Sequence, residues 1–195
     1  MILIPARLRP LATVLLALAA ACSEAHAVAP SVSAQRARAE YEVRAAFLVA
    51  FAKYTQWPDR VLPQPGGELV VGVLGEDPFG TALDALHGER VQGFRVAVKR
   101  FRSPGEAQKC QVLYFPQGQE RHLPALRDWI ARHAVLTVGE NARFLELGGA
   151  LFLFSESERL RFIVDQAALD RAGLGMDAKA LSLAKRVLNK HSERP

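Results

Sequence analysis

Apolar positions along this chain follow two different spacings, one typical of helices and one typical of strands. Apolar residues three or four positions apart predict a long helix over Ala34–Trp57 and a shorter one over Leu123–His133. Short apolar runs bounded by glycine or proline predict strands. The predicted helices are Ala34–Trp57, Phe79–Leu86, Leu123–His133, Gln166–Ala172 and Asp177–Asn189, with short helical turns at Ser103-Pro104 and Arg143–Leu147. The predicted strands are Leu69–Leu74, Phe94–Phe101, Val112–Phe115, Val135–Val138, Leu151–Phe154 and Leu160–Val164.

The order of these elements predicts an α/β fold. Strands that alternate with helices form a mostly parallel central sheet with helices on both faces, a three-layer α/β/α arrangement. The last two strands flank Ser155–Arg159, which has the composition of a hairpin turn. We therefore expect an antiparallel hairpin at an edge of the sheet. No repeat or domain boundary interrupts residues 28–195, which predicts a single domain.

The first residues have the features of an export signal. Two arginines precede the apolar run Leu11–Ala21, and residues 25–27 (Ala-His-Ala) offer a cleavage site. The run is too short for a membrane-spanning helix, which needs about 20 apolar residues. We therefore expect residues 1–27 to be a cleaved signal peptide and residues 28–195 to act in the periplasm.

The two cysteines differ in what they can do. Cys22 follows three alanines, as in the lipid-attachment motif of bacterial lipoproteins, but that motif carries leucine three residues before the cysteine and Leu18 lies one place too early. A lipid anchor at Cys22 is therefore the less favoured outcome. After cleavage Cys110 is left without a second cysteine for an intramolecular disulfide. Its place at the start of the apolar run Cys110–Phe115 favours burial over an intermolecular bond or redox chemistry.

Composition and local motifs argue against nucleic-acid binding and against catalysis. The net charge of +5 is mild, and no block of basic residues alternates with aromatic ones. The loop Gly72–Pro78 follows a strand, as phosphate-binding loops do, but Glu76 and Asp77 would repel an anion there. The histidines lack metal-ligand spacing, and the one basic residue beside Cys110, Lys109, should point the other way on a strand. We predict no catalytic, cofactor-binding or metal-binding residues and no enzyme; a hydrolase with dispersed residues is the remote alternative.

Several short segments, taken together, are similar to one protein family. They are Val43–Pro58 (VRAAFLVAFAKYTQWP), Leu74-Gly75 with Asp77-Pro78-Phe79, Gly93–Arg100 (GFRVAVKR), Cys110–Phe115 (CQVLYF), Val135–Val138, Gly148-Gly149, Arg161–Val164 and Lys179–Ala184. In this order, over about residues 41–187, they resemble the YfiR family of periplasmic regulators.

The resemblance implies a non-enzymatic binding protein with no cofactor. Better-studied members of this family restrain an inner-membrane diguanylate cyclase from the periplasmic side and so lower cyclic-di-GMP signalling and biofilm formation. An OmpA-like outer-membrane lipoprotein can sequester them. Other members are found beside sensor kinases or transporters, so a sensor kinase is a second candidate partner, and a homodimer is a further assembly left open.

The family also suggests where a partner would bind. The Gly148-Gly149 turn, the hairpin and the helix after it contribute the candidate partner-binding residues Leu151, Phe162, Ile163, Asp165 and Leu169. The competing interpretation is that apolar residues of a buried strand belong to the core.

This chain departs from the family in two respects. The paired cysteines of many members are replaced by Val71, Leu145 and Phe152, and the acidic-x-Asn pattern after the hairpin phenylalanine is absent. The alternative function is a periplasmic small-molecule receptor feeding a sensor kinase or transporter. It would need an apolar pocket at the carboxyl ends of the strands.

Overall fold

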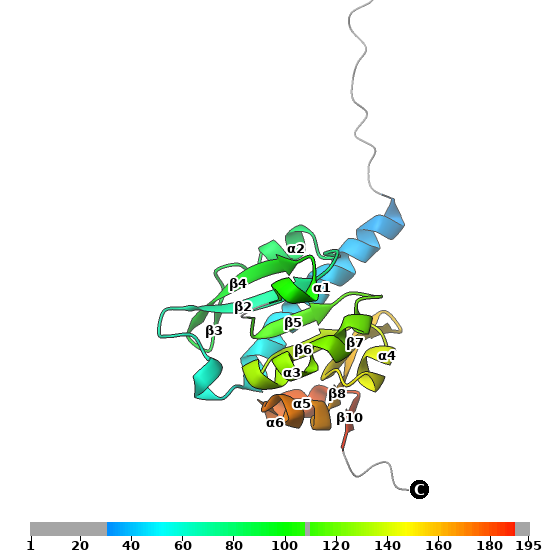
Figure 1. The fold of residues 1–195 in the computed structure, drawn as a ribbon. Helices are drawn as coiled ribbons and strands as arrows, with labels where there is room; N and C mark the ends of the chain where they lie inside the picture. Colours follow the sequence, from blue (N-terminus) through cyan, green and yellow to red (C-terminus); the bar gives the residue numbers. More distant parts are fainter. Residues whose placement is uncertain (1–30, 108–109, 190–195) are drawn as a thin grey trace, which may run out of the picture.

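An eight-stranded sheet runs through the centre of the molecule (Figure 1), with the strand order β10-β8-β7-β6-β5-β2-β4-β3. The computed structural model describes residues 31–107 and 110–189, so the predicted signal peptide and Cys22 lie outside the described residues. The strands of this sheet are β2 Glu68–Leu74, β3 Arg90–Val91, β4 Phe94–Phe101, β5 Val112–Phe115, β6 Leu136–Gly139, β7 Leu151–Glu156, β8 Arg159–Asp165 and β10 Arg186–Leu188. A separate antiparallel pair joins β1 Thr55–Gln56 to β9 Gly175–Met176.

The sheet is mostly parallel, as the alternation of elements predicts. The pairs β10–β8, β6–β7, β5–β6, β2–β5 and β2–β4 are parallel, while β7–β8 and β3–β4 are antiparallel. Its central strands are buried on both faces: every residue of β5 and β6 is buried. Such strands have continuous apolar sequences because helices cover both sides.

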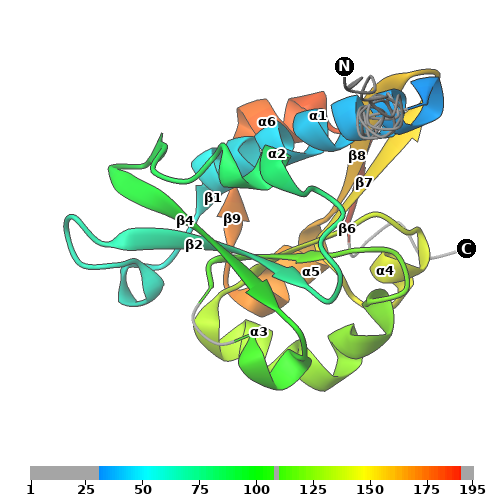
Figure 2. The ribbon, with the colours of Figure 1, turned by 90° about the horizontal axis from the view of Figure 1, so that it is seen from above.

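Helices cover the two faces and confirm the three-layer α/β arrangement (Figure 2). One face carries α1 Val32–Tyr54, α2 Thr81–Asp84 and α6 Ala178–Leu183, and the other carries α3 Leu123–His133, α4 Arg143–Glu146 and α5 Gln166–Ala172. Short 3₁₀ turns at Asp59–Val61, Pro104–Glu106 and Glu120–His122 complete the connections.

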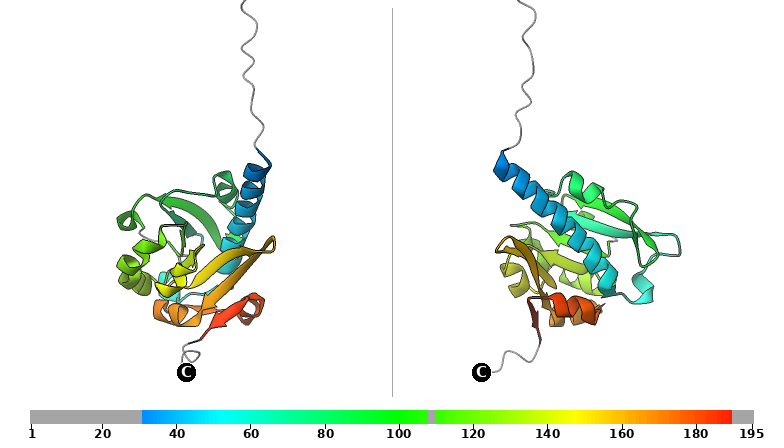
Figure 3. Two further views of the ribbon diagram at one scale, coloured as in Figure 1. Left: turned by 90° about the vertical axis from the view of Figure 1, so that its right-hand side faces the viewer. Right: turned by 180° about the vertical axis from the view of Figure 1, so that it is seen from behind.

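The long helix α1 has two parts with different environments. Ser31 caps its first turn by accepting a hydrogen bond from the Ala34 amide, and residues 31–39 are exposed on all sides. Figure 3 shows these first turns extending past the sheet. The second half packs on the sheet through Leu48 and Phe51, whose ring lies 5.0 Å from that of Phe162 in β8. Tertiary packing therefore holds the C-terminal half of α1.

The C-terminal helix predicted over Asp177–Asn189 is wrong in its second half. Asp177 does cap a helix, accepting a hydrogen bond from the Lys179 amide, but α6 ends at Leu183 and residues 186–188 form β10. The reason is tertiary: the Lys185 amide donates to the Phe162 carbonyl, and β10 pairs with the free edge of β8. A paired strand satisfies backbone groups of β8 that a continued helix would leave open.

This extra strand changes where the predicted hairpin lies. The β7–β8 hairpin forms as expected, but β10 places it one strand in from the edge. The antiparallel hairpin at the edge of the sheet is instead β3–β4, at the opposite end, joined by Gln92 and Gly93. Both turn residues have positive φ, 50° and 87°, as the tight hairpin turn requires.

Two other helices are shorter than the apolar spacing predicts. The first, α1, ends at Tyr54 because Thr55 becomes extended and pairs with Met176 of β9. The helix predicted over Phe79–Leu86 is one turn, α2, because Gly80 adopts φ 53° and interrupts the helical backbone before Thr81. Strand pairing therefore overrides the helical spacing at the end of α1, and the backbone of Gly80 does so before α2.

Candidate partner-binding site

The outer end of the sheet has one covered face and one partly open face. Along β7 the buried residues Leu151 and Leu153 alternate with the half-buried Phe152 and Phe154. The buried set faces α1, since Phe162, which pairs with Leu153, packs against α1 aromatic rings. Because side chains alternate along a strand, Phe152 and Phe154 face the opposite side, where their rings stack at 4.8 Å.

A hollow of about 600 Å³ lies over this open face, and we call it the end hollow. Its floor is made of Phe152 from β7, Ile163 from β8 and Leu188 from β10. Its walls are α4, through Leu145 and Glu146, and α5 together with the strand end before it. The side chains that line it are Ala142, Leu145, Glu146, Phe152, Ile163, Asp165, Ala167, Arg171, Arg186, Leu188 and Asn189.

The wall formed by α4 is fixed by one aromatic side chain. Phe144 is fully buried, and a Cβ added at Gly149 would lie 2.1 Å from its ring. A Cβ at Gly139 would meet the same ring at 2.4 Å. Glycine at these two positions therefore allows Phe144 to insert beside the turn, which holds α4 at the rim of the end hollow.

Charged groups border the apolar floor. Arg186 stands beside Ile163 in the pairing of β10 with β8, and Arg171 reaches within 4.0 Å of Asp165. Asp165 already has a structural role, because its Oδ1 accepts a hydrogen bond of 2.9 Å from the Ala168 amide and caps α5. An apolar floor with a polar rim is the anatomy of many protein interfaces.

The sequence-predicted site residues separate into two groups in the structure. Leu151 and Leu169 are completely buried and Phe162 is 5 % exposed, so all three belong to the core beneath the surface. Ile163 and Asp165 line the end hollow. The remaining residues that line it were not predicted, among them Phe152, Arg186 and Leu188. Large apolar residues on both faces of Leu151–Phe154 are a sequence signal that could have indicated Phe152 as a surface residue. No such signal exists for the β10 residues, because their segment fits a helical pattern.

The carboxyl ends of the strands, where a small-molecule receptor would bind, hold a buried polar network. At the end of β6, Glu140 accepts hydrogen bonds from the Tyr114 hydroxyl (2.8 Å), the Tyr41 hydroxyl (3.1 Å) and the Gln117 amide (2.7 Å). Arg44 of α1, only 6 % exposed, lies 3.7 Å from Glu140 and pairs with Glu40 at 2.6 Å. We call these five side chains, Glu40, Tyr41, Arg44, Tyr114 and Glu140, the carboxyl-end network.

Burial and charge shift the pKa values in this network. Burial, assisted by the Glu140 carboxylate, raises the pKa of Tyr41 to about 12 and raises that of Tyr114 further. The hydrogen bond from Ser155 lowers the pKa of Glu40, and Arg44 adds to that effect. The ring of Phe79 packs on both tyrosines, at 5.3 and 4.8 Å, so side chains fill this end of the sheet.

The other candidate reactive groups have structural places. Cys110 is buried, as predicted, and burial raises the pKa of its thiol to about 12, which keeps it protonated and unreactive at neutral pH. His133 Nδ1 lies 2.9 Å from the Trp129 carbonyl at the end of α3. Among residues 31–107 and 110–189 no group of acidic, histidine or cysteine side chains could hold a metal ion. Within the same ranges no helix has the length and apolar content needed to cross a membrane.

Comparison with known proteins adds one decisive match. A family model described as YfiR/HmsC-like matches residues 41–185. The chain belongs to the YfiR/HmsC-like family. The match takes in α4, β7, β8 and α5 of the end hollow, whereas the β10 residues Arg186 and Leu188 lie beyond it.

More distant similarities to solved structures accompany this YfiR/HmsC-like match. An ABC domain from Streptococcus pneumonia, solved in complex with L-Trp, has a TM-score of 0.49 and 10 % identity over 74 % of this chain and 60 % of its own. A conserved domain protein from Vibrio cholerae O1 biovar eltor has a TM-score of 0.43 and 11 % identity over 75 % of this chain and 60 % of its own. The chain therefore spans about 60 % of the length of both structures. No curated protein matches it.

Proposed function

We propose that this protein is a periplasmic, non-enzymatic regulator that binds the periplasmic region of a membrane diguanylate cyclase and restrains it. The observation that carries the proposal is the end hollow, with an apolar floor left open at one end of the sheet. Membership of the YfiR/HmsC-like family supports the regulatory class, and the export signal predicted over residues 1–27 supports the location.

The chemistry of the end hollow suits a protein segment. Phe152 lies beside Ile163 and stacks its ring on Phe154, and aromatic residues with arginines dominate binding energy at protein interfaces. A wide hollow of about 600 Å³ on a sheet face admits several side chains at once. A partner that covers it removes apolar area from water, which stabilises the complex by roughly 25 cal/mol per Å² before the costs of association.

Regulation follows if the partner has two states. A ligand shifts such an equilibrium only by binding one state more tightly than the other. A restrained cyclase therefore requires that this protein bind the inactive arrangement of the cyclase more strongly. Moving the cyclase from almost fully active to almost fully inactive needs a difference of about 5.5 kcal/mol between the two states.

Release of the cyclase needs a competitor for the same surface. We propose that an OmpA-like outer-membrane lipoprotein occupies the end hollow and so excludes the cyclase. If the partner is a sensor kinase, we expect it to bind the same surface, and only the regulated pathway differs. The alternative function, a small-molecule receptor, gains no support from the carboxyl ends of the strands, because Tyr41, Phe79 and Tyr114 pack together there.

A pull-down tests this function directly. The tagged chain is expressed with its own signal and isolated with detergent-solubilised membranes, and the co-purifying proteins are identified by mass spectrometry. We expect a diguanylate cyclase to be captured by the wild-type chain and by Val43→Asp, since Val43 is 48 % exposed on α1, away from the end hollow. We expect Ile163→Asp to lose it. Capture of a sensor kinase would assign the protein to a different signalling pathway. Capture of no specific membrane protein would contradict the proposal.

A further inference from the structure

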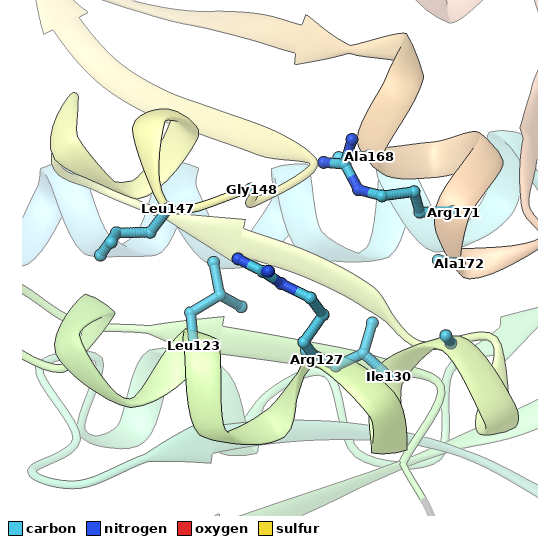
Figure 4. A pocket seen from close by; sticks show the side chains of 9 residues that line it. Leu123, Arg127, Ile130, Leu147, Gly148, Ala168, Arg171 and Ala172 are labelled. Atoms are coloured by element: carbon cyan, nitrogen blue, oxygen red, sulfur yellow. The ribbon is translucent and has the colours of Figure 1, made fainter.

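A second and much smaller hollow lies beside the end hollow, and we call it the α3–α5 notch (Figure 4). It has a volume of about 30 Å³ and lies between α3 and α5, with Leu147 and Gly148 closing one side. Its inner surface is apolar, formed by Leu123, Ile130, Leu147, Ala168 and Ala172. A space of this size holds about one water-sized group, so only the tip of a side chain or a small ion can enter.

Two arginines reach this notch from facing helices. Arg127 comes from α3 and Arg171 from α5, and Figure 4 shows both guanidinium groups turned toward the Leu147–Gly148 turn. A Cβ added at Gly148 would lie 3.3 Å from Arg171 Nη2, and Gly148 has φ +92°. Glycine in this turn therefore leaves room for the Arg171 side chain, and a larger residue would reduce that room.

The positive charge at the notch is poorly neutralised. Within the described ranges, Arg127 has no carboxylate within 4.0 Å, and the nearest to Arg171 is Asp165 at 4.0 Å. Asp165 is also engaged with the α5 amide of Ala168. Two guanidinium groups that line one notch without a full counter-charge attract an anion, and the planar guanidinium fork fits a carboxylate particularly well.

The notch adjoins the end hollow, because Arg171 lines both. A protein segment that covers Phe152 and Ile163 therefore passes directly by Arg171. An acidic residue of that segment would place its carboxylate between the two arginines and its methylene group on the apolar wall of the notch.

We propose that the α3–α5 notch is a subsite for an acidic side chain, aspartate or glutamate, of the protein that covers the end hollow. This inference rests on the proposed function and adds the chemistry of one partner residue to it. Arg127 and Arg171 hold the carboxylate, and the apolar wall favours an acidic side chain over a hydrated inorganic anion.

The subsite itself can be tested without the partner. N-acetyl-glutamate N-methylamide presents the glutamate side chain alone, and the matching glutamine compound is its neutral control. In the full chain labelled with ¹⁵N-arginine, we expect the glutamate compound to shift the Nε–Hε signals of Arg127 and Arg171, with no shift from the glutamine compound. Arg132→Gln, an exposed α3 position outside the notch, should keep the shifts, and Arg127→Gln should remove them.

Three results of that titration would overturn the subsite. One is an equal response to the glutamine compound, which would indicate contact without charge recognition. Another is a response that persists in Arg127→Gln. The third is a response to inorganic phosphate with none to the glutamate compound, which would indicate a phosphate site instead.

The captured partner then separates this inference from the proposed function. At about 50 mM salt we expect Arg127→Gln and Arg171→Gln each to weaken binding about tenfold, with a smaller loss at high salt because ions screen the pair. If Ile163→Asp abolishes binding while both arginine variants bind as the wild type does, the subsite is wrong and the proposed function stands. If none of the three variants changes binding, the end hollow is not the partner surface, so the subsite and the proposed surface both fail while the captured partner still stands.

Discussion

The carboxyl-end network and the end hollow differ in polarity and in burial. In the network, Glu140, Arg44 and two tyrosines are largely withdrawn from water, and each finds partners among its neighbours. In the end hollow, Phe152 and Ile163 are apolar, yet they are only partly buried and line a surface hollow. Buried polar groups persist where they are satisfied, whereas a large open apolar patch is a candidate binding surface.

This contrast explains why the polar cluster is the poorer candidate for function. Ionisable groups with shifted pKa values often mark active sites. Here the shifts follow from burial and from hydrogen bonds that close on themselves through Glu140, and Phe79 packs over the tyrosines. The network therefore holds α1 against the ends of β5 and β6, and we propose the end hollow as the binding surface.

The largest expected effect comes from breaking the network. Glu140→Ala removes the acceptor of two tyrosine hydroxyls and leaves buried Arg44 with Glu40 as its one carboxylate partner, so we expect a loss of about 3 kcal/mol in the free energy of unfolding. Urea denaturation measures it. Glu158→Ala, at an exposed ion pair with Arg36, is the control and should change stability by less than about 0.5 kcal/mol. Equal losses for the two variants would show that the network is not a structural element.

Alkaline pH should lower the free energy of unfolding. The folded-state pKa values of Tyr41, Tyr114 and Cys110 are raised, so the folded protein retains protons that the unfolded chain releases. Stability is therefore unaffected below about pH 9 and falls as pH rises toward 12, by at most about 1.4 kcal/mol per pH unit for each group. Urea midpoints between pH 7 and 11 measure it. Tyr114→Phe should flatten the decline, and a decline unchanged in that variant would contradict the assignment.

A smaller effect sharpens the role of Asp165 at the rim of the end hollow. Asp165→Ala removes the cap of α5 and should cost about 1 kcal/mol, while Asp165→Asn keeps an acceptor for the Ala168 amide and should cost only a few tenths. Thermal unfolding of the two variants measures the difference. If the asparagine variant is as unstable as the alanine variant, the charge facing Arg171 matters more than the cap.

The fold was predictable where local pattern and tertiary environment agree. The structure reproduces the predicted bounds of Phe94–Phe101, Val112–Phe115, Leu123–His133 and Gln166–Ala172. The apolar spacing of a buried strand or an amphipathic helix indicates which of its faces are buried. The strand β10 could not be predicted, because Leu181, Ala184 and Leu188 fit a helix and its partner β8 lies more than twenty residues away in sequence.

The site was predictable only in part for a related reason. Family resemblance pointed to the hairpin, but it could not separate Phe162, which packs beneath, from Ile163, which faces the end hollow. That separation depends on which face of the sheet α1 covers. The burial of Arg44 also depends on tertiary structure, because its partners Glu140 and the Leu153 carbonyl come from distant parts of the chain.

The most direct test of the end hollow as the partner surface is a binding titration. The periplasmic region of the captured membrane protein is titrated against the wild-type chain, Ile163→Asp and Val43→Asp by calorimetry. The account predicts that Val43→Asp binds as the wild type does and that Ile163→Asp weakens binding about 100-fold or more, because it places a desolvated charge on an apolar floor. Wild-type affinity in a folded Ile163→Asp variant would contradict it.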